Sequence, residues 1–282
     1  MELIFSAALC SVVVSILLKV CRSKGFSMIE MITWNYAIAS ILCYFWFQPD
    51  LQHISVLNTP WLLILSLGIL LPSVFLILAK SLQTAGILKT EIAQRLSVIL
   101  SLSAAYFIFH EQFNNYKWMG IALGLVGVLF VLWSHRSTSL ATNKGVLYLA
   151  LVWIGYALID VLLKYTTGLG LQFAVVLNLM FIAAFIISLI YIKLKYKTFG
   201  APQNIFAGLL LGCLNFANIA LYVKAHMLLK DSPAVVFAGM NILVVILGVL
   251  SGLIFFKEKL KLTTLIGLIF GLASIVCLAL AF

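Results

Sequence analysis

Phe109-His110-Glu111-Gln112 and Phe256-Lys257-Glu258-Lys259 are two short charged stretches, and a long apolar segment follows each of them. Small residues follow both glutamates at the same distances of nine, thirteen and sixteen positions: Gly120, Gly124 and Gly127 in the first copy, Gly267, Gly271 and Ser274 in the second. On a helix these positions share one face, where small residues let another helix approach closely. The two glutamates are 147 positions apart in a chain of 282 residues. The pattern therefore predicts two related halves.

The composition is that of a membrane protein. Hydrophobic residues make up 64% of the chain and charged residues 9%, with a mean hydropathy of +1.19. A soluble domain of this size could not bury so much apolar surface. Apolar runs of about 20 residues, the length that spans a bilayer, recur along the whole chain. Ten spans are predicted at residues 3–21, 28–47, 61–81, 86–109, 114–134, 145–165, 171–191, 204–226, 233–256 and 262–281.

A second pair of matching stretches supports the repeat. Ile16-Leu17-Leu18-Lys19 ends the first span, and Val161-Leu162-Leu163-Lys164 ends the sixth. Each half then holds five helices, and an odd number forces the halves into opposite membrane orientations, as in many secondary transporters. We predict an all-α polytopic membrane protein of ten transmembrane helices in two inverted repeats. The first repeat covers 1–134, a polar linker 135–144, and the second repeat 145–282.

The charges in the connections predict the orientation. If the first span starts outside, thirteen basic residues fall at the inner connections: Lys19, Arg22, Lys24, Lys80, Lys89, Arg136, Lys144, Lys193, Lys195, Lys197, Lys257, Lys259 and Lys261. Four fall at the outer ones: Lys117, Lys164, Lys224 and Lys230. Because positive charge concentrates on the cytoplasmic side, both termini are expected outside a bacterial cytoplasmic (inner) membrane.

Several classes of function are not expected. The net charge of +10 comes from basic residues scattered over helix ends and short loops, a distribution typical of lipid headgroup contacts and not of nucleic-acid binding. The five cysteines show no metal-binding spacing. Phosphate-binding loops and the common hydrolase and metalloprotease motifs are missing from the sequence. We therefore expect no enzyme, no metal and no cofactor.

The repeated glutamate, the G-x3-G-x2-G/S pattern after it and the two five-helix halves resemble the drug/metabolite transporter superfamily, in its EamA-type ten-helix branch. The lysines that close the first and sixth spans, Lys19 and Lys164, are also common in that family. The resemblance covers nearly the whole chain. It implies that helices 1–4 and 6–9 line a central cavity while helices 5 and 10 lie at the periphery. It also implies transport of small metabolites, often export of amino acids and related compounds.

Ionisable side chains inside membrane spans are the first candidates for a functional site, because burying them in the bilayer is costly. Arg95 lies deepest, and Glu91 precedes it by four positions, the favourable order for an ion pair. Two interpretations stay open. Either the residues are functional, with Arg95 holding an anionic substrate group or Glu91 accepting a proton, or the two form a self-neutralised structural pair. Asp160 and Lys164 repeat the spacing, and they are either part of a cavity wall or a pair at the membrane interface.

Amide and aromatic side chains supply the remaining candidates for substrate binding. Gln94 and Asn241 occupy equivalent positions in the two halves, which suggests a site on the axis between them. The alternative is helix–helix hydrogen bonding, worth about 0.6 kcal/mol per bond. Stripes at helical spacing add Trp153 and Tyr156 in the sixth span and Asn215, Asn218 and Tyr222 in the eighth, and the adjacent Trp34 and Asn35 are further candidates in the second span.

Glu111 and Glu258 invite a coupling role, but each lies in a short connection at a helix start. A carboxylate there meets the positive end of a helix dipole, so we interpret both as caps.

These features together predict a secondary active transporter of small polar metabolites, an amino acid or a related compound, that exports its substrate by alternating access. Its expected partners are a small-molecule substrate, the lipid bilayer, and a coupling proton or counter-substrate. Two alternatives remain. Arg95, Lys80, Lys89 and Lys224 would suit an anionic organophosphate or nucleotide-sugar. A non-transporting scaffold or accessory subunit would instead have a dry, close-packed interior.

Overall fold

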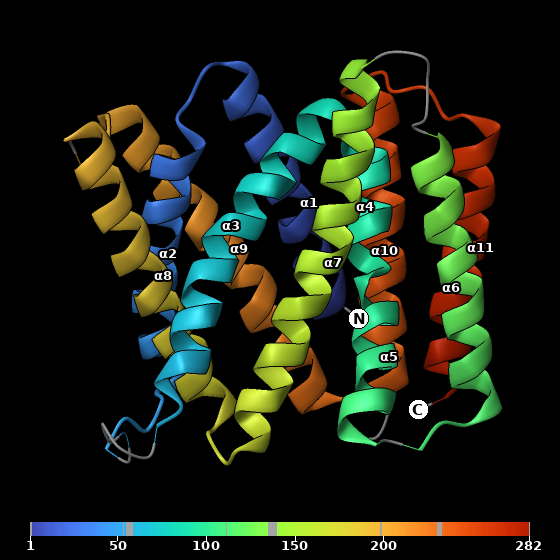
Figure 1. The fold of residues 1–282 in the computed structure, drawn as a ribbon, viewed down its shortest axis with the longest axis horizontal. Coiled ribbons are helices and arrows are strands. Elements are labelled where there is room, and N and C mark those ends of the chain that lie inside the picture. Colours follow the sequence, from blue (N-terminus) through green and yellow to red (C-terminus); the bar gives the residue numbers. More distant parts are fainter. Residues whose placement is uncertain are drawn as a thin grey trace.

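The computed structural model describes residues 2–52, 54, 59–110, 112–134, 140–197, 199–229 and 233–281. These residues form eleven α-helices and no strand (Figure 1). The helices are α1 (Glu2–Ser23), α2 (Met28–Phe47), α3 (Trp61–Thr84), α4 (Ile87–Arg95), α5 (Ser97–Phe109), α6 (Asn115–Ser134), α7 (Leu140–Gly168), α8 (Phe173–Tyr196), α9 (Pro202–Leu228), α10 (Pro233–Ile254) and α11 (Leu262–Ala279).

The described helices make ten spans that are long and apolar enough to cross a membrane. The predicted number of spans is therefore confirmed, and the all-helical fold with it. Helices α4 and α5 together form the fourth span, Ile87–Ile108. The sequence predicts one continuous helix at 86–109, and the structure corrects this to two helices that follow each other within one span.

The break in the fourth span lies at Leu96. The Ser97 hydroxyl donates to the Gln94 carbonyl oxygen at 2.7 Å, a local bond that competes with the helical ladder. The Trp153 indole Nε1 on α7 donates to the Leu96 carbonyl oxygen at 2.9 Å. The same carbonyl oxygen also accepts the Ile99 N–H at 3.1 Å, so the backbone at the break is hydrogen-bonded inside the span, as a membrane requires. Tryptophan on a neighbouring helix thus stabilises the interruption.

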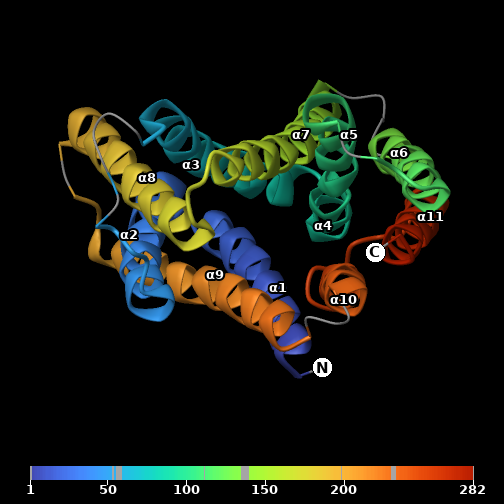
Figure 2. The same cartoon turned by 90° about the horizontal axis from the view of Figure 1, so that it is seen from below.

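The two copies of the glycine pattern pack against each other. Helices α6 and α11 lie side by side at one edge of the molecule (Figure 2). A Cβ added to Gly127 would lie 3.0 Å from the Gly267 carbonyl oxygen, so the backbones nearly touch. The Ser274 hydroxyl donates to the Gly120 carbonyl oxygen at 2.6 Å. The expected close helix contact is therefore present, and each copy is the other's partner.

The other spans form two groups. In the first group α2 packs along α9, where a Cβ on Gly208 would meet the Met31 backbone, and also against α8, while α1 packs on α9 and α3 on α8. The second group holds α4, α5 and α10, with α7 contacting both α3 and α5 (Figure 2). The largest buried apolar cluster belongs to the first group and includes Leu67, Leu78 and Phe181.

Two faces of the bundle are named here after their place in Figure 1. The upper face holds the connections 24–27, 85–86 and 255–261, and the lower face holds the connection 169–172 and the end of α11. The lysines of the upper connections make this the face predicted to be cytoplasmic. The inverted relation between the two halves stays a prediction.

Candidate functional site

A cavity of about 850 Å³ lies between the two groups of helices. Its lining comes from α1, α2, α3, α4, α5, α7, α8, α9 and α10, and α6 and α11 contribute none of it. This is the arrangement that the family resemblance implies. Helices α3 and α8, which carry none of the predicted site residues, also contribute to the lining. The lining includes Phe173 and Met227, both exposed at the ends of their helices, so the cavity reaches the lower face.

One wall of the cavity is apolar. Helices α3 and α8 supply it through eight side chains: Leu71, Val74, Phe75, Leu78, Phe173, Leu177, Met180 and Phe181. On α3 these positions recur every three or four residues, so they form one stripe. The same stripe continues into the buried core of the first helix group. A ligand in the cavity would therefore meet hydrocarbon on this side.

The rest of the lining combines polar and apolar side chains. It carries the predicted residues Gln94, Arg95, Tyr156, Asp160, Asn215, Asn218, Tyr222 and Asn241, together with Ser11, Ser15 and Ser97. Gln94, Arg95 and Ser97 flank the break in the fourth span, and the interruption thus places polar groups at the cavity surface. Broken helices in secondary transporters commonly mark the substrate site.

Arg95 and Glu91 contact α1 and not each other. The Arg95 Nη2 donates to the Ser11 hydroxyl at 2.6 Å, and the Ser15 hydroxyl donates to the Glu91 carboxylate. No ion pair within 4.0 Å joins Glu91 to Arg95, both of which are described. The two side chains therefore form no direct ion pair, and the choice between a binding and a structural role stays a prediction. Arg95 also lies in the last turn of α4, where a cation meets the negative end of the helix dipole.

Asp160 places on the cavity wall a carboxylate whose charge is opposite to that of Arg95. Its Oδ2 accepts a hydrogen bond from the Ser101 hydroxyl at 3.1 Å, and its side chain is exposed within the lining. Tyr156, one turn earlier on α7, also lines the cavity. The cavity therefore combines one cationic and one anionic side chain.

The two amides at matching positions of the repeat line the same cavity. Gln94 and Asn241 both line it, one from each half of the chain. The Asn241 Nδ2 donates to the Phe237 carbonyl oxygen of its own helix at 2.8 Å. The Asn215 Nδ2 donates to the Asn35 Oδ1 at 3.3 Å. Both bonds use the Nδ2 atom, which leaves the Oδ1 atoms of Asn215 and Asn241 to accept a hydrogen bond from a ligand.

Three buried polar atoms of the lining have no hydrogen-bond partner among the described residues. They are the Arg95 Nε, the Tyr36 hydroxyl and the Asn218 Oδ1. A buried polar atom without a partner is costly, and each of these atoms is shielded from water, so a bound molecule would reach it only if neighbouring side chains of the lining move. The three atoms offer one charged donor, one acceptor and one hydroxyl that can do either.

Some predicted site residues lie outside the lining. Trp153 bonds the broken backbone at Leu96, and the Trp34 indole donates to the Phe199 carbonyl oxygen at 3.0 Å. Asn35 is fully buried behind Asn215. Glu91 is fully buried on α4. Lys164 is exposed one turn beyond Asp160 on α7. Helical spacing found the right helices but could not decide which turn faces the cavity.

The cavity also contains residues that the sequence did not single out. Ser11 and Ser15 are common in helices, and the apolar wall has the composition of any buried helix face. Tyr36 and His226 carry a stronger signal, because both are polar aromatics inside apolar spans. The His226 ring lies edge-on to that of Tyr222, with 4.7 Å between the ring centres.

Of the two repeated glutamates, Glu111 lies outside the described residues. Glu258 does cap a helix, but the helix is α4 of the other half and not α11, which follows it in the chain. Within the described part of the chain, no group of three His, Cys, Asp or Glu side chains could hold a metal ion.

The fold and the cavity define an integral multi-pass membrane protein with an internal chamber. Residues 2–133 match the EamA-like transporter family, and the chain belongs to this family, within the drug/metabolite transporter superfamily. An uncharacterized protein of Haemophilus influenzae (strain ATCC 51907 / DSM 11121 / KW20 / Rd) is 40% identical over 98% of this chain and 97% of its own. A solved structure described as "Crystal structure of protein" shares the fold with a TM-score of 0.55 and 13% identity, covering 95% of this chain and 97% of that one.

Proposed function

We propose that the protein is a secondary active transporter that exports a small metabolite, an amino acid or a related compound, across the bacterial inner membrane by alternating access. One observation carries the proposal. The cavity of about 850 Å³ reaches one face and has the charged Arg95 and Asp160 and the amides of Gln94, Asn215 and Asn241 in its lining. A scaffold protein would have a close-packed interior, and a chamber lined by charged and amide groups would only destabilise it.

The charges in the cavity favour a zwitterion over a dianion. Arg95 suits a carboxylate, Asp160 suits an ammonium group, and the α3–α8 wall suits an apolar side chain. Asp160 would repel a phosphate or a nucleotide-sugar. The lysines that suggest such anions, Lys80, Lys89 and Lys224, do not line the cavity. The ligand that fits is polar at one end only, a refinement of the small polar metabolite inferred from composition.

The helix contacts support two inverted halves that move against each other. Helix α1 packs on α9 and α10, and α7 packs on α3 and on the α4–α5 span. Helix α2 likewise packs on α9, and α8 on α3. If each span of the first half is exchanged with its counterpart in the second half, the α1–α9 pair becomes α7–α3 and the α1–α10 pair becomes α7 with the α4–α5 span. The α2–α9 pair becomes α8–α3. Such a relation gives the cavity two equivalent ways to open, driven by a coupling proton or a counter-substrate.

A ligand-stabilisation screen of the purified protein tests the proposal. A ligand at one hundred times its dissociation constant stabilises the folded state by about 2.7 kcal/mol. Zwitterionic amino acids with apolar side chains should raise the melting temperature, whereas organophosphates and nucleotide-sugars should not. Arg95→Gln should abolish the shift, and Lys224→Gln, a matched removal of charge outside the lining, should preserve it. Stabilisation by organophosphates alone, lost in Lys224→Gln, would favour the alternative substrate class.

A further inference from the structure

The cavity ends before the upper face. On α1 the lining residues Ser11 and Ser15 are four positions apart, and Lys19 lies four further along the same stripe. On α3 the lining stripe ends at Leu78. Between this depth and the upper face lies a layer of apolar side chains, each no more than 2% exposed: Leu18, Leu82, Ile87 and Leu88.

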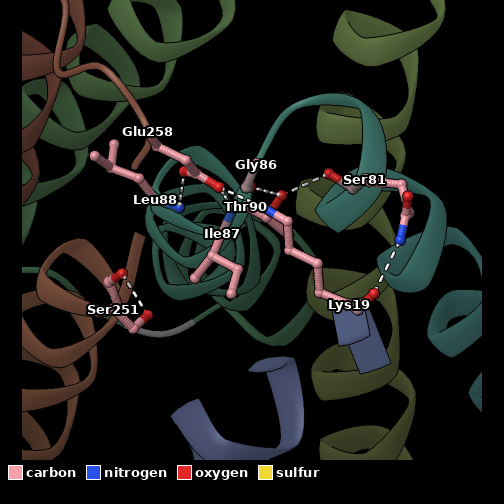
Figure 3. A network of polar contacts seen from close by, with 10 residues as sticks. Lys19, Ser81, Gly86, Ile87, Leu88, Thr90, Ser251 and Glu258 are labelled. Atoms are coloured by element: carbon pink, nitrogen blue, oxygen red, sulfur yellow. Dashed lines mark hydrogen bonds and ion pairs between the residues drawn. The ribbon is translucent and has the colours of Figure 1, made fainter. Parts of the chain in front are cut away.

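An ion pair lies just beyond that apolar layer. The Lys19 Nζ is 2.5 Å from the Glu258 Oε1, and the two side chains are only 16% and 17% exposed (Figure 3). The same carboxylate accepts the backbone N–H groups of Ile87 at 2.8 Å and Leu88 at 3.1 Å. Glu258 therefore joins three elements: α1, the start of α4, and the connection from α10 to α11. We call these contacts the upper clasp.

The backbone around Glu258 is built to hold this position. Gly86 precedes α4 with a φ of +92°, and a Cβ there would lie 2.6 Å from the Glu258 carboxylate. The Glu258 N–H donates to the Gly252 carbonyl oxygen at 2.9 Å, which folds the connection back toward α10. The Phe256 ring lies 4.2 Å from the Lys19 Nζ. The carboxylate thus has a fitted seat on a helix N-terminus, where an anion is favoured.

We propose that Lys19 and Glu258 are gating residues, whose ion pair closes the upper end of the cavity and breaks once in each transport cycle. The proposal rests on the proposed function and assigns it two residues outside the cavity. Lys19 belongs to the first helix group, whereas Glu258 and α4 belong to the second. When the groups separate at the upper face, the clasp has to open, together with the neighbouring hydrogen bond between the Ser81 hydroxyl on α3 and the Thr90 hydroxyl on α4. A charge-assisted contact of this kind also holds the closed state in the absence of substrate.

A second carboxylate provides a matched control. The Glu30 Oε2 on α2 accepts the Ala201 N–H at the start of α9 at 2.9 Å and the Asn204 Nδ2 at 2.8 Å. Gly200 precedes this helix with a φ of +110° and also crowds the carboxylate. The geometry repeats that of Glu258, but no lysine pairs with Glu30 among the described residues. Helices α2 and α9 are held together along their length, so this cap stays closed.

Accessibility of a cysteine between cavity and clasp tests the proposal. Leu82 continues the α3 stripe one turn beyond Leu78 and is fully buried. In a background without the five native cysteines, Leu82→Cys is labelled with a membrane-impermeant maleimide applied to the upper face of oriented membrane vesicles. Glu258→Gln and Lys19→Gln should each label about tenfold faster than the parent, the order expected for losing one charge-assisted contact. Glu30→Gln should label at the parental rate.

A second probe reports the other side of the cavity. Met227→Cys lies at the lower mouth, and its labelling from the lower face should fall when the clasp variants favour the upper-open state. If Glu258→Gln does not fold, Lys19→Gln decides, because it removes the ion pair and leaves the α4 cap in place. Unchanged labelling at both probes in folded Lys19→Gln would overturn the gate. Labelling needs no substrate, so it can contradict the gating proposal even when a ligand binds and the proposed function stands. Equally, the screen above can fail while the labelling changes as expected.

Discussion

Removal of the Ser15 hydroxyl should destabilise the protein out of proportion to the size of the change. Ser15 is 2% exposed and Glu91 is fully buried, and the hydroxyl donates to one carboxylate oxygen. The other oxygen, Oε2, has no partner among the described residues. Ser15→Ala would therefore leave the buried carboxylate without a hydrogen bond from any described residue. Loss of a hydrogen bond to a charged group costs about 1.5–3 kcal/mol, and we expect the free energy of unfolding to fall by that amount.

The assay is thermal unfolding of the purified protein, with two further serine-to-alanine changes measured beside it. Ser11→Ala removes the 2.6 Å bond to Arg95, but Arg95 lines the cavity and can be solvated there, so the loss should be smaller. Ser73 is exposed and bonds only the carbonyl oxygen of Ile69 on its own helix, so Ser73→Ala should change little. A Ser15→Ala protein as stable as Ser73→Ala would refute the reasoning.

Three further outcomes are expected. Gln94→Ala or Asn241→Ala should weaken ligand affinity by about 1–3 kcal/mol, the cost of an unsatisfied polar partner, with little change in melting temperature; equal loss of stability would mean that the amides serve packing. Gly127→Leu should cost about 1–3 kcal/mol by overpacking α6 against α11, whereas a neutral result in thermal unfolding would contradict the backbone contact. Reporter fusions at Phe282 and in the 135–144 linker should label opposite sides of the membrane, with the linker cytoplasmic; a cytoplasmic C-terminus would reverse the proposed orientation.

The spans and their closest packing could be predicted because both depend on local signals. A run of apolar residues has to match the bilayer, and the spacing of Gly120, Gly124 and Gly127 shows a small-residue face whatever lies against it. The break at Leu96 could not be predicted in this way. It depends on the Ser97 hydroxyl choosing a backbone carbonyl and on a Trp153 indole arriving from a helix more than fifty positions away.

Part of the candidate site could also be predicted from local signals. Ionisable and amide groups inside spans must face protein or water, so Arg95, Asp160 and Gln94 fall on the cavity. The hydrogen-bond partners of Glu91 and Arg95 could not be predicted. At their helical spacing the two residues could pair with each other, but they bond two serines of α1. The role of Glu258 was also hidden, since its partners in the first half are distant in sequence. Long-range contacts of this kind leave no periodic trace.

The one-sided cavity has a consequence for how the membrane potential acts on the protein. A chamber open to the lower face and lined by polar groups admits water, so the electric field falls mainly across the thin apolar layer around Leu18, Leu82 and Ile87. A unit charge that crosses this layer feels about 2.3 kcal/mol per 100 mV. A zwitterion has no net charge and crosses without electrical work. For the proposed substrate, voltage would therefore drive only the coupling ion, and the rate of export would report that ion's charge.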